Sequence, residues 1–268
     1  MKIVRFMNED GKIHYGIIEN GGDDKAFIIE GDIFKTIRVT DKTEKINVFL
    51  SPIDPPNIFA LGFNYGGHAE ESDVMYPERP IIFMKANTSV IGHGEAIVLP
   101  QAGPDEVDYE AELAVVIGKT AKNITPDEVE RYILGYTCGN DISARDWQFH
   151  KQKDQWTRGK SFDTFCPLGP WLVTADEIND PNRLNVRSLL NGQIMQDSNT
   201  ARMIFHVASV ISDLSKSMTL QPGTVIMTGT PDGVGFTREP PVFLKDGDTI
   251  TVEVEHIGQL TNPVKMER

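Results

Sequence analysis

The chain has 268 residues, of which 40% are hydrophobic and 24% are charged, so it is long enough for one large domain, or for a main domain with a small second one. It carries 39 acidic and 26 basic residues, and this formal charge of −13 argues against a nucleic-acid-binding protein, which needs clustered lysine and arginine. No segment reaches the roughly 18 apolar residues of a membrane-spanning helix. The start, MKIVRFMNEDGK, lacks the pattern of a signal peptide. Because Cys138 and Cys166 have neither metal nor redox spacing, we expect two reduced thiols in a cytoplasmic protein.

The first part of the chain is predicted to be a small β-rich domain. Apolar segments at 2–6, 12–18 and 25–29 are typical of strands, and the polar segments at 8–11 and 20–23 between them are typical of turns. A proline-rich break follows at 51–56. We therefore expect a small N-terminal domain at 1–52 and a catalytic domain at 53–268.

The rest of the chain is predicted to be mostly strands, with few helices. Apolar segments indicate strands at 57–62, 80–85, 96–100, 111–118, 224–229, 248–258 and 260–266. A helix is expected to start at Thr125, which is followed by proline and two acids, and a second helix is expected at 201–217, where apolar residues recur at helical spacing. The regular alternation of strands and helices of a doubly wound fold is absent from the sequence, so we predict a β-rich α+β fold.

Three acidic residues are the candidate metal ligands. If 111–118 is a strand, Glu110 and Glu112 point to the same side, while Ala111 and Leu113 point to the other. Two like charges on one side repel each other unless a cation lies between them, although they can equally be the solvent-facing half of an amphipathic strand. Asp141 is a third acid, at the end of the apolar segment 132–140. Carboxylate oxygens suit Mg²⁺ or Mn²⁺, and also Ca²⁺, better than zinc.

The ordered motifs of the chain resemble those of the fumarylacetoacetate hydrolase superfamily, and in particular its acylpyruvase and fumarylpyruvate hydrolase members. The resemblance rests on five segments between about residues 58 and 265: NYGGH at 64–68, DYEAEL at 108–113, NDISARDWQ at 140–148, GKSFDTFCPLGP at 159–170 and TGTPDGVG at 228–235. It implies a catalytic domain with a mixed β-roll or β-sandwich fold, a homodimer, and one Mg²⁺ or Mn²⁺ on Glu110, Glu112 and Asp141. Members cleave a carbon–carbon bond in β-diketo acids such as acylpyruvates.

Hydrolysis of such a substrate needs a base that activates water, and His68 is the best candidate because imidazole titrates near neutral pH. If 68–71 is helical, His68 and Glu71 share a face, so that the carboxylate can orient the ring. The resemblance supports this pair, because the hydrolases of the family carry an H-x-x-E pair on a mobile lid. Without the resemblance, an exposed histidine is the simpler interpretation.

The resemblance also implies roles for four further side chains. Lys160 would place positive charge beside the developing enolate, although a surface lysine is the alternative. Arg145 and Gln148 would bind the substrate carboxylate, and Thr230 would donate a hydrogen bond to the substrate. Four further residues are candidates for the lining of the acyl pocket: Phe63, where relatives often have arginine, together with Met75, Tyr76 and Trp156.

Three functions remain open from the sequence. The leading one is a metal-dependent hydrolase of acylpyruvate-type substrates, in which the metal acts as a Lewis acid that stabilises the departing enolate. The second keeps the same site for oxaloacetate-type decarboxylation or hydroxymuconate-type isomerisation. The third, a binding protein without catalysis and with structural Ca²⁺, does not explain the nearby Lys160, Arg145, Gln148 and His68.

Overall fold

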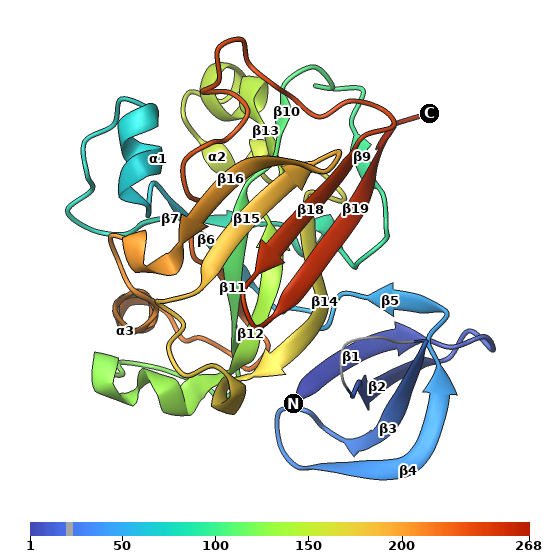
Figure 1. The fold of residues 1–268 in the computed structure, drawn as a ribbon. Helices are drawn as coiled ribbons and strands as arrows, with labels where there is room; N and C mark the ends of the chain where they lie inside the picture. The colour runs from blue at the N-terminus through green and yellow to red at the C-terminus, as the bar shows by residue number, and fades with distance from the viewer. Residues whose placement is uncertain (20–23) are drawn as a thin grey trace.

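Strands make up most of the regular structure in residues 1–19 and 24–268, the part of the chain that the computed structural model describes (Figure 1). The turn expected at 20–23 lies outside the described residues. The strands are β1 Lys2–Met7, β2 Ile13–Ile17, β3 Lys25–Gly31, β4 Ile37–Lys45, β5 Val48–Leu50, β6 Ile58–Gly62, β7 Ile81–Lys85, β8 Val90–Ile91, β9 Ile97–Leu99, β10 Val107–Asp108, β11 Ala111–Ile117, β12 Ile133–Asn140, β13 Ser143–Ala144, β14 Cys166–Thr174, β15 Asn185–Leu190, β16 Gln193–Asn199, β17 Val225–Met227, β18 Thr249–Val254 and β19 Gly258–Met266.

The helices are short. They are α1 Gly66–Glu71, α2 Trp156–Gly159 and α3 Val207–Ser217, together with a π-helix at Asp146–Lys151 and 3₁₀ helices at Asn87–Ser89, Pro126–Tyr132, Ala175–Glu177 and Thr200–Arg202. Within the described residues, none of these helices combines the length and the apolar character needed to cross a membrane. The predicted β-rich α+β fold is confirmed.

A twelve-stranded sheet runs through the whole molecule. Its main order is β4-β3-β2-β1-β14-β12-β11-β17-β6-β7, with β5 and β8 paired off this path to β1 and β14. The N-terminal strands join it because β1 pairs antiparallel with β14, with Lys2 opposite Val173 and Ile3 opposite Leu172. Figure 1 shows β1 to β5 at the lower end of the sheet, away from α1. The domain boundary between residues 52 and 53 stays a prediction.

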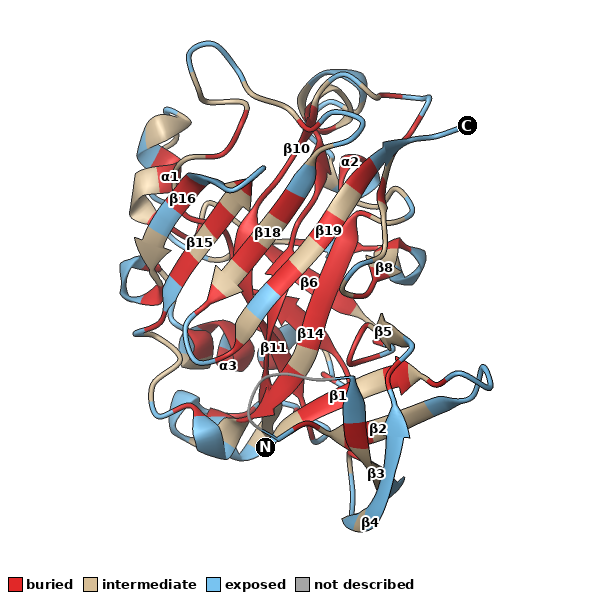
Figure 2. Cartoon of the chain, turned by 45° about the vertical axis from the view of Figure 1, so that its right-hand side comes forward, coloured by how far each residue is buried: buried red, intermediate tan, exposed pale blue. Residues whose placement is uncertain are grey.

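A second sheet covers the middle of the first. Its five strands have the order β16-β15-β18-β19-β9, and it packs on β11, β12 and β14 (Figure 2). The apolar core between the two sheets includes Leu113 and Val115 from β11 and Val252 and Val254 from β18. The amphipathic helix α3 closes one side of this core. Strand β11 therefore lies in the centre of the molecule. The carboxylates of Glu110 and Glu112, at the start of this strand, must lie there too.

Strand β11 has the alternation that the sequence predicts. Ala111, Leu113, Val115 and Ile117 belong to one core cluster, whereas Ala114 and Val116 belong to another on the opposite face. Both faces are thus buried, and the interpretation of Glu110 and Glu112 as the solvent-facing half of an amphipathic strand is wrong, since their exposed fractions are 4% and 0%.

The second predicted helix starts later than expected. The sequence predicts helix from 201, but α3 begins at Val207, and His206 precedes it in an extended conformation with ψ 158°. The cause is Asn64, whose side chain accepts a hydrogen bond from Phe205 N at 2.8 Å and donates to Phe205 O at 3.0 Å. These bonds, and a β-bridge between Met203 and Tyr65, keep 203–205 out of a helix, with Met203 extended and 204–205 in a bend. The helix expected at Thr125 is present as the 3₁₀ helix Pro126–Tyr132, with Thr125 as its N-cap.

Candidate active site

Three buried carboxylates meet where β11 begins and β12 ends. Glu110 directly precedes β11, Glu112 is its second residue, and Asp141 directly follows β12. The antiparallel pairing of these strands places the two ends side by side, and Asp141 N donates to the carbonyl oxygen of Glu110 at 3.0 Å. One oxygen from each carboxylate lies within 4.8 Å of the other two. The structure therefore brings the three predicted ligands into one cluster.

Lys160 and Arg145 supply positive charge to one side of this cluster. Lys160 Nζ lies 2.8 Å from both Glu110 Oε1 and Asp141 Oδ2, and Arg145 Nη1 lies 2.7 Å from Glu110 Oε1. Both side chains are buried. Burial alone would raise the pKa of Glu110, but the charges of Lys160 and Arg145 lower it to about 2. Glu110 is therefore ionised at neutral pH.

Lys85 is a third buried cation, which sequence reasoning missed. It ends β7, binds Asp141 Oδ1 and donates to the carbonyl oxygen of Ile142 at 3.2 Å. Its partner Asp141 is 56 residues away in the sequence, so no local pattern indicates the pair. The one signal in the sequence is its position at the end of an apolar strand. Burial of a lysine there costs free energy unless an acidic partner lies beside it, so the position indicates such a partner.

Glu112 is the least neutralised of the three acids. Its Oε2 accepts a hydrogen bond from Gly229 N at 2.7 Å, whereas its Oε1 is buried and has no hydrogen-bond partner among the described residues. Burial, and after it the negative charges of Asp141 and Glu110, raise the pKa of Glu112 well above its usual value. An unpartnered oxygen in a cluster of hard oxygen donors fits a divalent cation such as Mg²⁺ or Mn²⁺. The residues present therefore fit a divalent cation, and the identity of the ion stays a prediction.

His68 and Glu71 lie on the same face of α1. His68 Nδ1 is 2.8 Å from Glu71 Oε1, and the other oxygen of Glu71 accepts bonds from Gly233 N at 2.8 Å and from Thr237 Oγ1 at 3.0 Å. Only 5% of His68 is exposed. The imidazole is therefore held by a carboxylate that is itself fixed by a neighbouring loop, and the interpretation of His68 as an exposed histidine is wrong.

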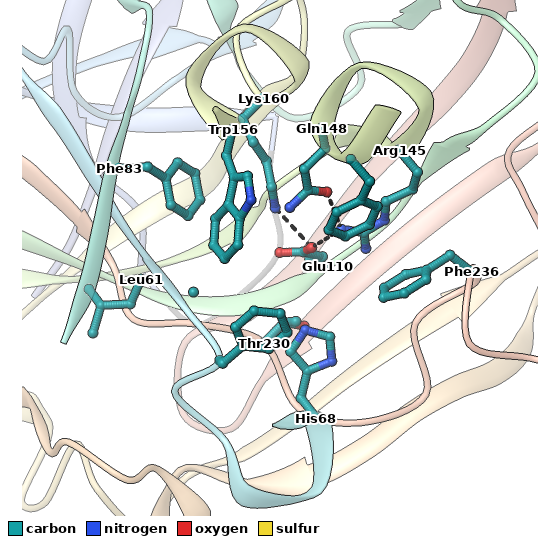
Figure 3. A pocket seen from close by; sticks show the side chains of 13 residues that line it. Leu61, His68, Phe83, Glu110, Arg145, Gln148, Trp156, Lys160, Thr230 and Phe236 are labelled. Atoms are coloured by element: carbon teal, nitrogen blue, oxygen red, sulfur yellow. Dashed lines mark hydrogen bonds and ion pairs between the residues drawn. The ribbon is translucent and has the colours of Figure 1, made fainter. Parts of the chain in front are cut away.

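Four of these groups line one pocket, namely His68, Glu110, Arg145 and Lys160. Figure 3 shows His68 on the opposite side of the pocket from Lys160 and Gln148, with Trp156 and Phe236 on the two flanks. Apolar side chains form the rest of the lining: Leu61, Phe63, Phe83 and Phe149. The pocket thus has charged groups at one end and aromatic walls around it, a combination that suits a small planar acid.

Gln148 and Thr230 also line the pocket. Gln148 Oε1 accepts a hydrogen bond from Arg145 Nη1 at 2.8 Å. Thr230 Oγ1 donates to the carbonyl oxygen of Ala111 at 3.0 Å and accepts from Gln196 Nε2 at 2.7 Å. The hydroxyl hydrogen of Thr230 is thus already used within the protein. Gln196 is a buried residue that the sequence did not indicate, because no motif marks it.

The candidate pocket residues from the sequence divide into two groups. Phe63 and Trp156 line the pocket, and the Phe63 ring stacks on His68 with centroids 5.3 Å apart. Phe63 has φ 50°, a strained value for a bulky residue. Met75 and Tyr76 lie outside, with exposed fractions of 90% and 54%, so their assignment to the pocket is wrong.

The fold and the site together define a β-rich enzyme with a buried carboxylate cluster that can hold a divalent cation. The chain belongs to the fumarylacetoacetate hydrolase family: residues 57–265 match the family model described as fumarylacetoacetate (FAA) hydrolase C-terminal, and residues 1–46 match the one described as Rv2993c-like, N-terminal. The family predicted from the sequence is confirmed.

Several known proteins are similar to this chain over most of its length. The fumarylacetoacetate hydrolase domain-containing protein 2 homolog of Dictyostelium discoideum is 44% identical over 93% of this chain and 90% of its own. Oxaloacetate tautomerase FAHD2A, mitochondrial, of Homo sapiens is 46% identical over 81% of this chain and 69% of its own. The solved structure of 5-carboxymethyl-2-hydroxymuconate delta-isomerase from Mycobacterium smegmatis is 40% identical, covers 100% of both chains and has a TM-score of 0.87. Because relatives include mitochondrial proteins, the cytoplasmic location stays a prediction.

Proposed function

We propose that the chain is a divalent-metal-dependent enzyme that interconverts the keto and enol forms of a small 2-oxo acid, with oxaloacetate as the first substrate to test. The observation that carries this proposal is the placement of His68, which Glu71 holds, across the pocket from Lys160 and from Glu110, the member of the carboxylate cluster that lines it. A proton carrier facing a cationic site is what enolisation requires. The names of the relatives support the substrate class, since several that are 46–49% identical are oxaloacetate tautomerases.

The metal in this proposal is Mg²⁺ or Mn²⁺, held by Glu110, Glu112 and Asp141. When bound, it would supply a Lewis acid that polarises the C2 carbonyl of the substrate. Lys160 already touches two of the three acids, so its ammonium adds positive charge on the same side of the pocket. We also infer that the enzyme is a homodimer that binds neither nucleic acid nor membrane, which light scattering and binding assays test.

His68 is the proposed base. It takes a proton from C3 of the keto form, the electron pair of the C–H bond becomes the C2–C3 double bond, and the C2 oxygen takes up a proton from water to give the enol, while His68 releases its proton to the solvent. The reverse steps return the proton to C3, so no bond between carbon atoms breaks. Glu71 orients the ring, because its other oxygen is fixed by Gly233 and Thr237. Its negative charge also stabilises the imidazolium.

Arg145 and Gln148 are the proposed partners of a substrate carboxylate. Asp108, Glu110 and Gln148 already use four of the five N–H groups of Arg145, so the guanidinium offers a substrate its charge and one remaining N–H, and Gln148 adds an amide donor beside it. Thr230 lies in the same wall, and its hydroxyl can donate to a substrate only by giving up its bond to Ala111. Aromatic walls then exclude water from the reacting carbon.

A second candidate is the hydrolysis of acylpyruvates. One observation favours it: the His68–Glu71 pair can activate water as well as a C–H bond. A relative from Exiguobacterium antarcticum that carries the name fumarylacetoacetate hydrolase is 36% identical, with a TM-score of 0.87. Decarboxylation of oxaloacetate and isomerisation of a hydroxymuconate use the same enolate, so they belong to the same substrate panel.

One experiment separates these reactions. Purified protein loaded with Mn²⁺ is given oxaloacetate or acetylpyruvate, while the enol absorbance and the pyruvate formed (through lactate dehydrogenase and NADH) are followed in parallel. A tautomerase changes the enol absorbance of oxaloacetate without releasing pyruvate above the blank. A decarboxylase releases pyruvate from oxaloacetate, and a hydrolase releases it from acetylpyruvate. Release of pyruvate as fast as the enol signal changes would contradict the proposal, and Glu112→Gln serves as the metal-deficient control.

A further inference from the structure

Asp108 is a buried acid that stands apart from the carboxylate cluster. It is 0% exposed and belongs to the same segment as Glu110 and Glu112, yet it is not part of the group that can hold a metal. Its Oδ1 accepts hydrogen bonds from Tyr109 N and Gly235 N, both at 2.8 Å. Its Oδ2 accepts three more, from Arg145 Nε, Arg145 Nη2 and Phe236 N. A carboxylate has about four lone-pair sites, so Asp108 has no oxygen left for a metal.

On one side Asp108 holds the guanidinium of Arg145. Its Oδ2 accepts from Arg145 Nε at 3.0 Å and from Arg145 Nη2 at 2.8 Å. These bonds fix one edge of the guanidinium, so that the opposite nitrogen, Nη1, faces Glu110 at 2.7 Å and Gln148 at 2.8 Å. The ring of Phe236 covers Arg145, with its centroid 4.4 Å from Cζ. The orientation of Arg145 in the pocket is therefore set by Asp108.

On the other side Asp108 holds the loop 233–237. Gly235 N and Phe236 N donate to its two oxygens at 2.8 and 3.0 Å. A Cβ at Gly235 would lie 2.4 Å from Asp108 Oδ1, so the loop backbone contacts the carboxylate directly. The same loop binds Glu71 through Gly233 N and Thr237 Oγ1. One short loop thus connects Asp108 to the carboxylate that orients His68.

We propose that Asp108 is a positioning residue that sets the placement of the His68–Glu71 pair relative to Arg145. The inference rests on the proposed function in one respect, namely that both groups act on the same substrate. Asp108 touches neither the proposed metal nor the substrate. It acts through Arg145 on substrate binding, and through the loop 233–237 on proton transfer.

The test is Asp108→Asn, which keeps the size of the side chain but replaces one acceptor oxygen by an NH₂ group. That group must face either Arg145 and Phe236 N or the backbone N–H groups of Tyr109 and Gly235, so bonds in at least one of the two connections are lost. We expect kcat/KM to fall between about 10-fold and 100-fold, with a higher KM and a lower kcat. Asp197→Asn is the matched control, because Asp197 is in an exposed pair with Arg187 at 2.8 Å, and it should retain wild-type kinetics.

Double-mutant cycles separate positioning from a general structural effect. If Asp108 acts through Arg145, then Asp108→Asn/Arg145→Lys should be no more than about threefold worse than Arg145→Lys alone. Likewise, Asp108→Asn/Glu71→Gln should be no more than about threefold worse than Glu71→Gln alone. Multiplicative losses in both cycles would overturn the proposal. If Asp108→Asn does not fold, Thr237→Val is the second variant, because it removes the hydrogen bond between the loop 233–237 and Glu71. It should lower kcat with little change in KM, and an unchanged kcat would overturn the proposal.

Two binding measurements keep this test independent of the reaction. Titration with Mn²⁺ alone should give Asp108→Asn nearly the wild-type affinity, whereas loss of Mn²⁺ binding would make Asp108 a metal ligand and overturn the proposal. Calorimetry of the Mn²⁺-loaded protein with oxalate, a planar diacid that has no C–H bond, should show at least about tenfold weaker binding to Asp108→Asn. Failure of the wild type to interconvert oxaloacetate would overturn the proposed function but not this inference, which oxalate binding still tests.

Discussion

Glu112 accepts a single hydrogen bond from Gly229 N, at 2.7 Å, and this bond leaves its other carboxylate oxygen buried without a partner among the described residues. Burial and the charges of Asp141 and Glu110 raise the pKa of Glu112 well above its usual value. The metal-free folded protein therefore keeps a proton that the unfolded chain has released. Between the ordinary glutamate pKa and this raised pKa, the free energy of unfolding falls as pH rises, because the folded state binds more protons.

A cation that binds Glu112 must displace this proton, so metal binding strengthens as pH rises. We expect the increase in Tm caused by Mn²⁺ to grow as the pH rises from the ordinary glutamate pKa towards the raised pKa of Glu112. Glu112→Gln stays neutral at every pH, so it removes the fall in stability with rising pH, and it keeps an acceptor for Gly229 N. Its metal-free Tm at about pH 8 should therefore exceed that of the wild type, and Mn²⁺ should no longer raise it. Differential scanning fluorimetry with and without Mn²⁺ measures both effects, and a wild-type Tm increase in Glu112→Gln would contradict the assignment.

His68→Gln tests the proposed base. Glutamine keeps a polar side chain of similar reach but cannot carry a proton near neutral pH, so kcat should fall by about two to four orders of magnitude. Mn²⁺ affinity should change little, because His68 is outside the carboxylate cluster. His206→Gln is the matched control, since His206 is exposed and its side chain makes no capping bond to α3. A kcat in His68→Gln close to that of this control would rule out His68 as the proton carrier.

The placements in the candidate site that the sequence anticipates are those with a local pattern. Alternation along 111–117 places Glu110 and Glu112 on one side, and a spacing of three places His68 and Glu71 on one face of α1. Antiparallel pairing of β11 with β12 then brings Asp141 to the same place, since both segments end at the same edge. The ordered motifs identify which segments of the chain meet at the site. The spacing of the acidic residues within one segment does not identify them.

The parts that the sequence misses depend on contacts between distant segments. Lys85 resembles any lysine at a strand end until Asp141, 56 residues later, is found beside it. Asp108 reads as one more acid of its motif, because its five donors come from three separate segments. The helix expected from 201 starts only at Val207 for a similar reason: apolar spacing continues through 203–205, but Asn64 binds the backbone of Phe205 and keeps it out of the helix. Tertiary hydrogen bonds here override local periodicity.

Lys85→Met tests the buried pair with Asp141. The methionine fills the space of the lysine stem but leaves a buried carboxylate with one cation fewer. We expect the metal-free free energy of unfolding to fall by about 3 kcal/mol. Saturating Mn²⁺ should recover part of this loss, because a dication then balances Asp141. Urea unfolding with and without Mn²⁺ measures the difference, and Lys216→Met is the control, since Lys216 lies 3.8 Å from Asp213 in an exposed pair and should change stability by less than about 0.5 kcal/mol. Equal effects of the two variants would show that the Lys85 pair contributes no more than a surface one.

The aromatic wall of the pocket can be tested at Gly62, the last residue of β6. A Cβ there would lie 2.1 Å from Cζ3 and 2.7 Å from Cη2 of Trp156, so Gly62→Ala must displace the indole, which lines the pocket. We expect kcat/KM to fall about 100-fold, since a shift of about 1 Å in a positioned group is enough for such a loss, while Mn²⁺ affinity stays unchanged. Gly62→Ala/Trp156→Phe should recover most of the activity, because phenylalanine lacks the two indole atoms that clash. A double variant as impaired as Gly62→Ala would mean that the backbone of β6, and not the position of the indole, limits the reaction.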